Sequence, residues 1–135
     1  MNFGQELYEI SRDISLEKKI WEEIKPHLKK IAADRHPKGC HIRFKGFVKN
    51  SICKIEDLIQ NDGIFYTEAA YFKSGIGRII ICWDESGKKK VNYDTRLYSL
   101  SDKYLEVTLT SDEHIAITER ELDDSIRVTD YTYIS

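Results

Sequence analysis

The run Ile79-Ile80-Ile81-Cys82-Trp83 is the feature that most constrains how this chain can fold. It follows Arg78 and ends at the turn-forming segment 84–87. A run of strand-forming residues without a charge is typical of a strand buried on both faces, and this one is too short for a helix. The sequence therefore predicts a central strand over 78–83, with helices on one side of it and further strands at both edges.

The chain of 135 residues has the size of one domain with one core. Its patterns divide residues 1–135 into a helical part (1–36), a mixed part (40–62) and a β-rich part (63–135). Three cysteines without a disulfide-like spacing, and no signal-peptide pattern, predict a cytoplasmic protein. No stretch approaches the roughly 20 apolar residues of a membrane span, so no membrane partner is expected.

Apolar residues at helical spacing predict two helices in the first part of the chain. The first covers 3–14, with Phe3, Leu7, Ile10 and Ile14 on one side. The second begins at Ser15, and its stripe consists of Ile20, Ile24, Leu28 and Ile31. Because a proline inside a helix removes a backbone donor and clashes with the preceding turn, Pro26 predicts a kink or break over 22–25.

Alternating patterns predict strands over 40–49, 64–73, 88–93 and 126–133 and a hairpin over 104–118. Ser51 is expected to cap a short helix that ends at Gln60. Segment 64–73 could also start a helical turn, but pairing with 78–83 favours a strand. The prediction is an α+β fold, with N-terminal helices packed on a mostly antiparallel sheet of six or seven strands. Its inward-facing residues are expected to include Ile42, Phe44, Ile80, Leu105, Val107, Ile115 and Ile117.

Three groups of residues superficially resemble catalytic or metal sites, and each has a structural explanation. His36, Cys40, His41 and Cys53 include two adjacent strand residues, which point to opposite faces and cannot share one zinc ion. The glycines of 73–78 fit a hairpin turn and lack the order of a phosphate-binding loop. His114 and its acidic neighbours lie at a hairpin tip, where side chains splay into water. We therefore expect no metal, no cofactor and no enzymatic activity.

The net charge of −2 is distributed unevenly along the chain. Residues 18–54 carry eleven Lys or Arg against three acids. On one face of the predicted strand 40–49, three cations alternate with an aromatic residue: Arg43, Lys45, Phe47 and Lys49. A cationic face with an aromatic suits a nucleic-acid backbone and a stacked base. One hypothesis is therefore a nucleic-acid-binding domain that uses segment 18–54.

The leading hypothesis rests on the acidic, tyrosine-rich part of the chain. Seven of the eight tyrosines lie in the sheet-forming region, and tyrosine is enriched at protein interfaces. The residues predicted to bind a protein are Tyr131, Tyr133, Asp123, Asp124 and Asp130. An acidic surface of this kind suits a basic protein partner. The sequence thus predicts a small cytosolic, non-catalytic protein-binding domain, inhibitor-like or immunity-like.

Overall fold

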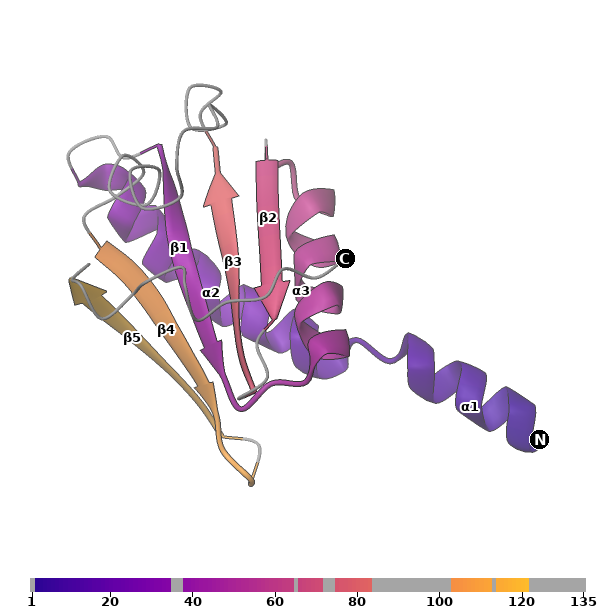
Figure 1. The fold of residues 1–135 in the computed structure, drawn as a ribbon. Coiled ribbons are helices and arrows are strands. Elements are labelled where there is room, and N and C mark those ends of the chain that lie inside the picture. Colours follow the sequence, from indigo (N-terminus) through magenta and orange to yellow (C-terminus); the bar gives the residue numbers. More distant parts are fainter. Residues whose placement is uncertain are drawn as a thin grey trace.

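The computed structural model describes residues 2–34, 38–64, 66–71, 75–83, 103–112 and 114–121. These residues form three helices and five strands in an α+β arrangement, as predicted (Figure 1). In chain order they are α1 (Phe3–Arg12), α2 (Ser15–Ala33), β1 (Gly39–Lys45), α3 (Lys49–Asn61), β2 (Tyr66–Tyr71), β3 (Ile76–Cys82), β4 (Lys103–Leu109) and β5 (Ile115–Glu121). The strands predicted over 88–93 and 126–133 lie outside the described residues.

The sheet is mixed and has the strand order β2-β3-β1-β4-β5. The pairs β2–β3, β1–β3 and β4–β5 are antiparallel, whereas β1 and β4 run parallel. The expectation of six or seven strands is therefore matched only in part, by five described strands. The predicted position of segment 78–83 was wrong: β3 is buried on both faces, but β1 is the middle strand. Periodicity identifies strands, but it does not fix their order across a sheet.

Helices α2 and α3 pack on the same face of the sheet, and α2 lies behind it in Figure 1. Each helix contributes a stripe at helical spacing, so that one side of each is buried. The helical part of the core consists of Ile20, Trp21, Ile24, Leu28, Ile31, Ile52, Ile55 and Ile59. Its strand part consists of Cys40, Ile42, Phe44, Ile79, Ile81, Leu105 and Val107. None of the helices within the described ranges is long and apolar enough to cross a membrane.

The break expected at Pro26 does not occur, because α2 is continuous from Ser15 to Ala33. Pro26 is exposed, so it lies away from the core. Its missing N–H removes one intrahelical hydrogen bond, whereas Ile24 and Leu28 on either side are both buried in the core. The burial of these neighbours offsets the local loss.

The strand predicted over 40–49 ends at Lys45, and the cause is Gly46. Gly46 has φ 83°, a left-handed conformation that turns the chain out of the sheet. Phe47 then enters the core, where its ring meets Phe44 edge-on with centroids 5.3 Å apart. Ser51 does not cap α3, which begins at Lys49; its hydroxyl instead donates to the buried Glu17 carboxylate at 3.0 Å.

The predicted inward-facing set is correct except for Ile80. Ile42, Phe44, Leu105 and Val107 belong to the core, and Ile115 and Ile117 pack against it. Because side chains alternate along β3, Ile79 and Ile81 face the helices and Ile80 faces away from them. The predicted β2–β3 pairing and the β4–β5 hairpin are confirmed.

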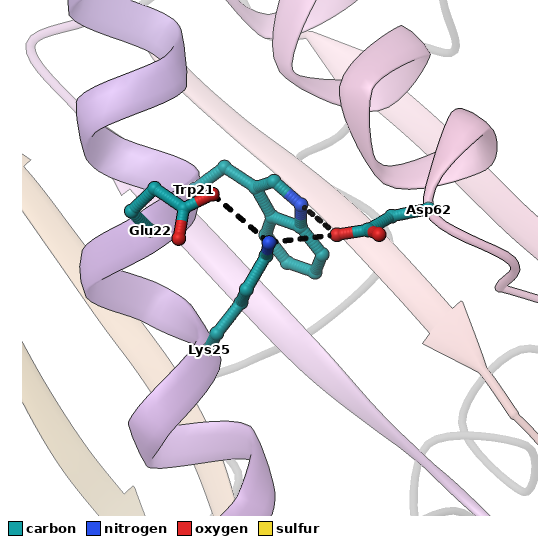
Figure 2. Close-up of polar contacts among 4 residues, drawn as sticks. All are labelled: Trp21, Glu22, Lys25 and Asp62. Atoms are coloured by element: carbon teal, nitrogen blue, oxygen red, sulfur yellow. Dashed lines mark hydrogen bonds and ion pairs between the residues drawn. The ribbon is translucent and has the colours of Figure 1, made fainter.

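A polar cluster joins α2 to the end of α3 (Figure 2). The Trp21 indole Nε1 donates to Asp62 Oδ2 at 2.9 Å, and Lys25 Nζ lies 2.8 Å from the same oxygen. Lys25 also contacts Glu22 at 2.9 Å and lies over the Trp21 ring. The hydrogen bonds from Lys25 and then Trp21 lower the pKa of Asp62. The cluster fixes the position of α3 along α2.

Two glycines with the same backbone conformation provide a test of the turn after β1. Gly46 and Gly63 both have φ 83°, but a Cβ at Gly46 would collide with the Leu109 carbonyl oxygen, whereas Gly63 faces open space. Gly63→Ala should cost about 1–2 kcal/mol of unfolding free energy from backbone strain alone. Gly46→Ala should cost at least about 1 kcal/mol more, because of the added clash. Urea unfolding followed by circular dichroism measures both; equal losses would show that the turn is not held against β4.

Candidate functional site

Two surfaces of the described structure carry side chains that the core does not explain. We call the first the α1 stripe; it consists of Phe3, Leu7, Ile10 and Ile14. We call the second the polar sheet face, on the side of the sheet away from α2 and α3. Its main side chains are His41, Arg43, Lys45, Glu68, Arg78, Tyr104, Glu106 and Arg120.

Helix α1 projects away from the rest of the molecule (Figure 1), and none of its residues is buried. It begins with a capping box, in which Asn2 Oδ1 accepts from Gln5 N at 2.9 Å and Gln5 Oε1 accepts from Asn2 N at 3.1 Å. Local hydrogen bonds therefore define where α1 starts. A ten-residue helix is marginal in water without tertiary packing, so this exposed helix would gain stability from contact with another surface.

The α1 stripe is strongly exposed for residues of its type. Phe3 is 64% exposed and Ile10 is 68% exposed, and Tyr8 on another side of α1 is 60% exposed. Scattered apolar residues are common on protein surfaces, but a contiguous apolar side on an unpacked helix marks an interaction site. The opposite sides of α1 are polar, so the helix is amphipathic without a partner among the described residues.

The junction between α1 and α2 is fixed by Asp13. Its carboxylate accepts from the backbone N of Ser15 at 2.9 Å, and its carbonyl oxygen accepts from Lys54 Nζ at 2.9 Å. The hydrogen bonds from Ser15 lower the pKa of Asp13. Beside this junction lies an open cleft of about 460 Å³, lined by Ile10, Asp13, Ser15, Leu16, Glu17 and Lys19. Ile10 thus belongs to both the stripe and the cleft.

The polar sheet face is arranged in rows across the strands. In one row Arg78 of β3 lies opposite Arg43 of β1, which lies opposite Glu106 of β4. In the next row His41 lies between Ile80 and Tyr104, and Arg120 follows on β5. Alternation along each strand places these residues on the face that α2 and α3 leave uncovered.

Ion pairs link part of the polar sheet face. Glu106, which is nearly buried, lies 3.3 Å from Lys45 Nζ and 3.5 Å from Arg120 Nη2. Arg78 is fully buried and its Nη2 lies 3.9 Å from Glu68 Oε1. A buried charge needs a partner, because desolvation disfavours the charged form. These pairs explain how β1, β4 and β5 can carry charges near the middle of the sheet.

His41 is 2% exposed, and burial is the largest cause that lowers its pKa to about 3, followed by Arg78 and Arg43. The imidazole is therefore neutral at pH 7. Its ring lies beside that of Tyr104, with centroids 5.7 Å apart. Neither Nδ1 nor Nε2 has a hydrogen-bond partner among the described residues. Most buried polar groups in folded proteins are hydrogen-bonded, so this histidine is unusual.

The structure separates the four residues predicted to bind nucleic acid. Arg43 and Lys45 share the polar sheet face, whereas Phe47 is buried in the core and Lys49 is exposed at the start of α3. Phe47 cannot stack on a base without leaving the core. The predicted protein-binding residues Asp123, Asp124, Asp130, Tyr131 and Tyr133 lie outside the described residues.

The residues first considered for metal or hydrolytic chemistry are also separated. Cys40 faces the helices and His41 the polar sheet face, while burial raises the pKa of Cys40 to about 12. His36 is outside the described ranges, within which no group of three potential ligands converges. His114 is exposed, with its Nδ1 3.8 Å from Asp112. Gly77 packs against Ile52, and a Cβ at this position would collide with that side chain. This close packing accounts for a glycine at position 77 without a phosphate-binding role.

Sequence reasoning identified the helix at 3–12 but missed that its apolar side is exposed. Periodicity reports that a side is apolar, and it does not report what covers that side. The polar sheet face was predicted only in part, through Arg43 and Lys45 on one face of the predicted strand. Strand alternation places His41, Arg43 and Lys45 on one face, and antiparallel pairing with β3 adds Arg78. Adding Arg78 to this face required knowledge of the register between β1 and β3.

No protein-family model matches the chain, and neither the curated proteins nor the solved structures contain a match.

The buried neutral His41 predicts a specific pH dependence of stability. Between pH 6.5 and about 3 the unfolded chain binds a proton at His41 that the folded chain does not. The stability contributed by this residue is therefore lost as pH falls through that window, at up to about 1.4 kcal/mol per pH unit. His41→Gln should unfold less steeply on acidification than the wild type, measured by urea titrations at several pH values. A slope for His41→Gln equal to that of the wild type would mean that His41 is protonated when folded.

Proposed function

We propose that this chain is a non-catalytic protein-binding domain, inhibitor-like or immunity-like, and that it contacts its partner through the α1 stripe. The observation that carries the proposal is the exposure of Phe3, Leu7 and Ile10 on a helix with no buried residue. Complete burial of an apolar side chain of this size is worth about 1.5–3 kcal/mol. In the chain alone this stabilisation is not realised, and a partner surface would supply it.

The spacing of the stripe matches a known mode of recognition. Phe3, Leu7 and Ile10 correspond to positions i, i+4 and i+7 of a helical surface, and Ile14 follows beyond the end of α1. Amphipathic helices that bind in apolar grooves present anchors at this spacing. The fixed junction at Asp13 and Ser15 would hold α1 in a defined direction from the core, which lowers the entropic cost of association.

Charge on α1 favours a basic partner. Glu6 lies three residues after Phe3 and four before Ile10, so it borders the stripe, and Glu6, Glu9 and Asp13 are all exposed. The expected partner is a protein with an apolar groove bordered by Lys or Arg side chains. This is the class of partner that the C-terminal residues Asp123, Asp124 and Asp130 also predicted, and that second contact surface stays a prediction.

The nucleic-acid alternative has less support. Arg43 and Lys45 remain together on the polar sheet face, but Lys45 is paired with Glu106 and the aromatic Phe47 lies in the core. Phe47, the aromatic residue predicted to stack on a base, is therefore not available beside these cations. The α1 stripe therefore gives the better account of an exposed interaction surface.

The proposal is tested by placing a charge within the α1 stripe. Leu7→Glu should abolish capture of a stoichiometric protein partner from native cell extract, with or without nuclease, because an unpaired carboxylate cannot enter an apolar groove. The matched control is Gln5→Glu, which adds the same charge at an exposed position of α1 and keeps the capping box. Binding by each variant is then measured by calorimetry with the purified partner.

Both variants should fold with wild-type stability, because neither side chain lies in the core. Loss of binding in Leu7→Glu together with retention in Gln5→Glu supports α1 as the contact element. Equal binding by both variants would contradict it. Capture that disappears after nuclease treatment would instead favour the nucleic-acid alternative.

A further inference from the structure

The polar sheet face contains buried hydrogen-bonding groups that have no partner among the described residues. His41 is buried, and both of its ring nitrogens are in this condition. Arg43, two residues along the same strand face, has a buried Nε that also lacks an acceptor there. Because buried polar groups in folded proteins are nearly always hydrogen-bonded, two neighbouring groups of this kind favour a bound acceptor.

The charges around His41 and Arg43 are predominantly positive. Arg43 lies directly opposite Arg78 across the β1–β3 pair, and Arg78 in turn lies 3.9 Å from Glu68. Arg43 is two residues from His41 on the same face of β1, and burial, Arg78 and Arg43 together lower the pKa of His41. The neighbouring carboxylate of Glu106 lies within 3.3 Å of Lys45 and 3.5 Å of Arg120. An anion between His41 and Arg43 would accept hydrogen bonds from both side chains.

We propose that His41 and Arg43 form a binding site for a single phosphate group, as inorganic phosphate or as part of a small phosphate ester. Guanidinium groups present planar pairs of donors that match phosphate oxygens, and a neutral imidazole adds one further N–H donor. Because His41 is buried, the site suits a small group and not a polymer backbone. Arg43 and Lys45, on the same strand face, are partly exposed. This site lies on the sheet, so it does not depend on the role proposed for α1.

Binding can be observed at His41 itself. The probe is inorganic phosphate, added to the full-length chain while the ring nitrogens of all four histidines are followed by long-range ¹H–¹⁵N NMR. We expect a saturable shift of the His41 signals and none at the exposed His114. Sodium acetate and sodium chloride at equal ionic strength are the parallel titrations. They distinguish a phosphate site from a carboxylate site and from a general salt effect.

The matched variants are Arg43→Gln and Arg12→Gln, the latter an exposed arginine on α1. Arg43→Gln should weaken phosphate binding at least about tenfold, because it removes a charge-assisted donor, whereas Arg12→Gln should bind as the wild type. Arg43→Lys keeps the charge without the planar donor pair and should also bind more weakly, which provides a second test if Arg43→Gln does not fold.

Three results would overturn the proposal. The first is a His41 signal that does not saturate with phosphate. The second is saturation by acetate but not by phosphate. The third is phosphate binding that is unchanged in both Arg43 variants, which would place the anion elsewhere on the molecule.

Discussion

The packing of the α2 stripe across the middle of the sheet is the interaction on which the rest of the structure depends. Ile20, Ile24 and Leu28 are buried against the face that contains Ile42 of β1, so the longest helix covers the strand that all others flank. Helix α3 is then positioned by three polar links to α2, from Ser51 to Glu17 and from Trp21 and Lys25 to Asp62. Apolar burial provides most of the stabilisation, and these directional contacts determine where α3 lies.

The parts of the fold that could be predicted from the sequence are those set by local periodicity. The presence of α1, α2 and the β4–β5 hairpin follows from spacing alone, although α1 ends at Arg12 and not at residue 14. Pro26 and Phe47 were misjudged for a different reason. At Pro26, the burial of neighbouring residues against the sheet kept α2 intact. At Phe47, the left-handed conformation of Gly46 ended β1 early and turned the following residue into the core. Local rules rank the options for a segment, and tertiary contacts select among them.

The candidate sites were harder to predict because each depends on a relation between segments. The α1 stripe looks in sequence like the stripe of α2, and only the completed fold shows that one is covered and the other is not. The polar sheet face requires knowing that β1 lies between β3 and β4, which brings Arg78 and Glu106 to either side of Arg43. The two faces of the sheet therefore differ in character: one is apolar and covered by helices, and the other gathers charge around a neutral histidine.

The middle position of β1 has a consequence for how the chain folds as it is synthesised. β1 is the first strand to emerge, but its two neighbours are β3 and β4, and His41 pairs with Tyr104 far later in the chain. The β2–β3 and β4–β5 hairpins can each form from local contacts, whereas β1 must wait with both edges unpaired until they are complete. During that interval α2 and α3 are the elements that can cover Ile42 and Phe44. The early helices thus cover the apolar face of an incomplete sheet before they serve as part of the finished core.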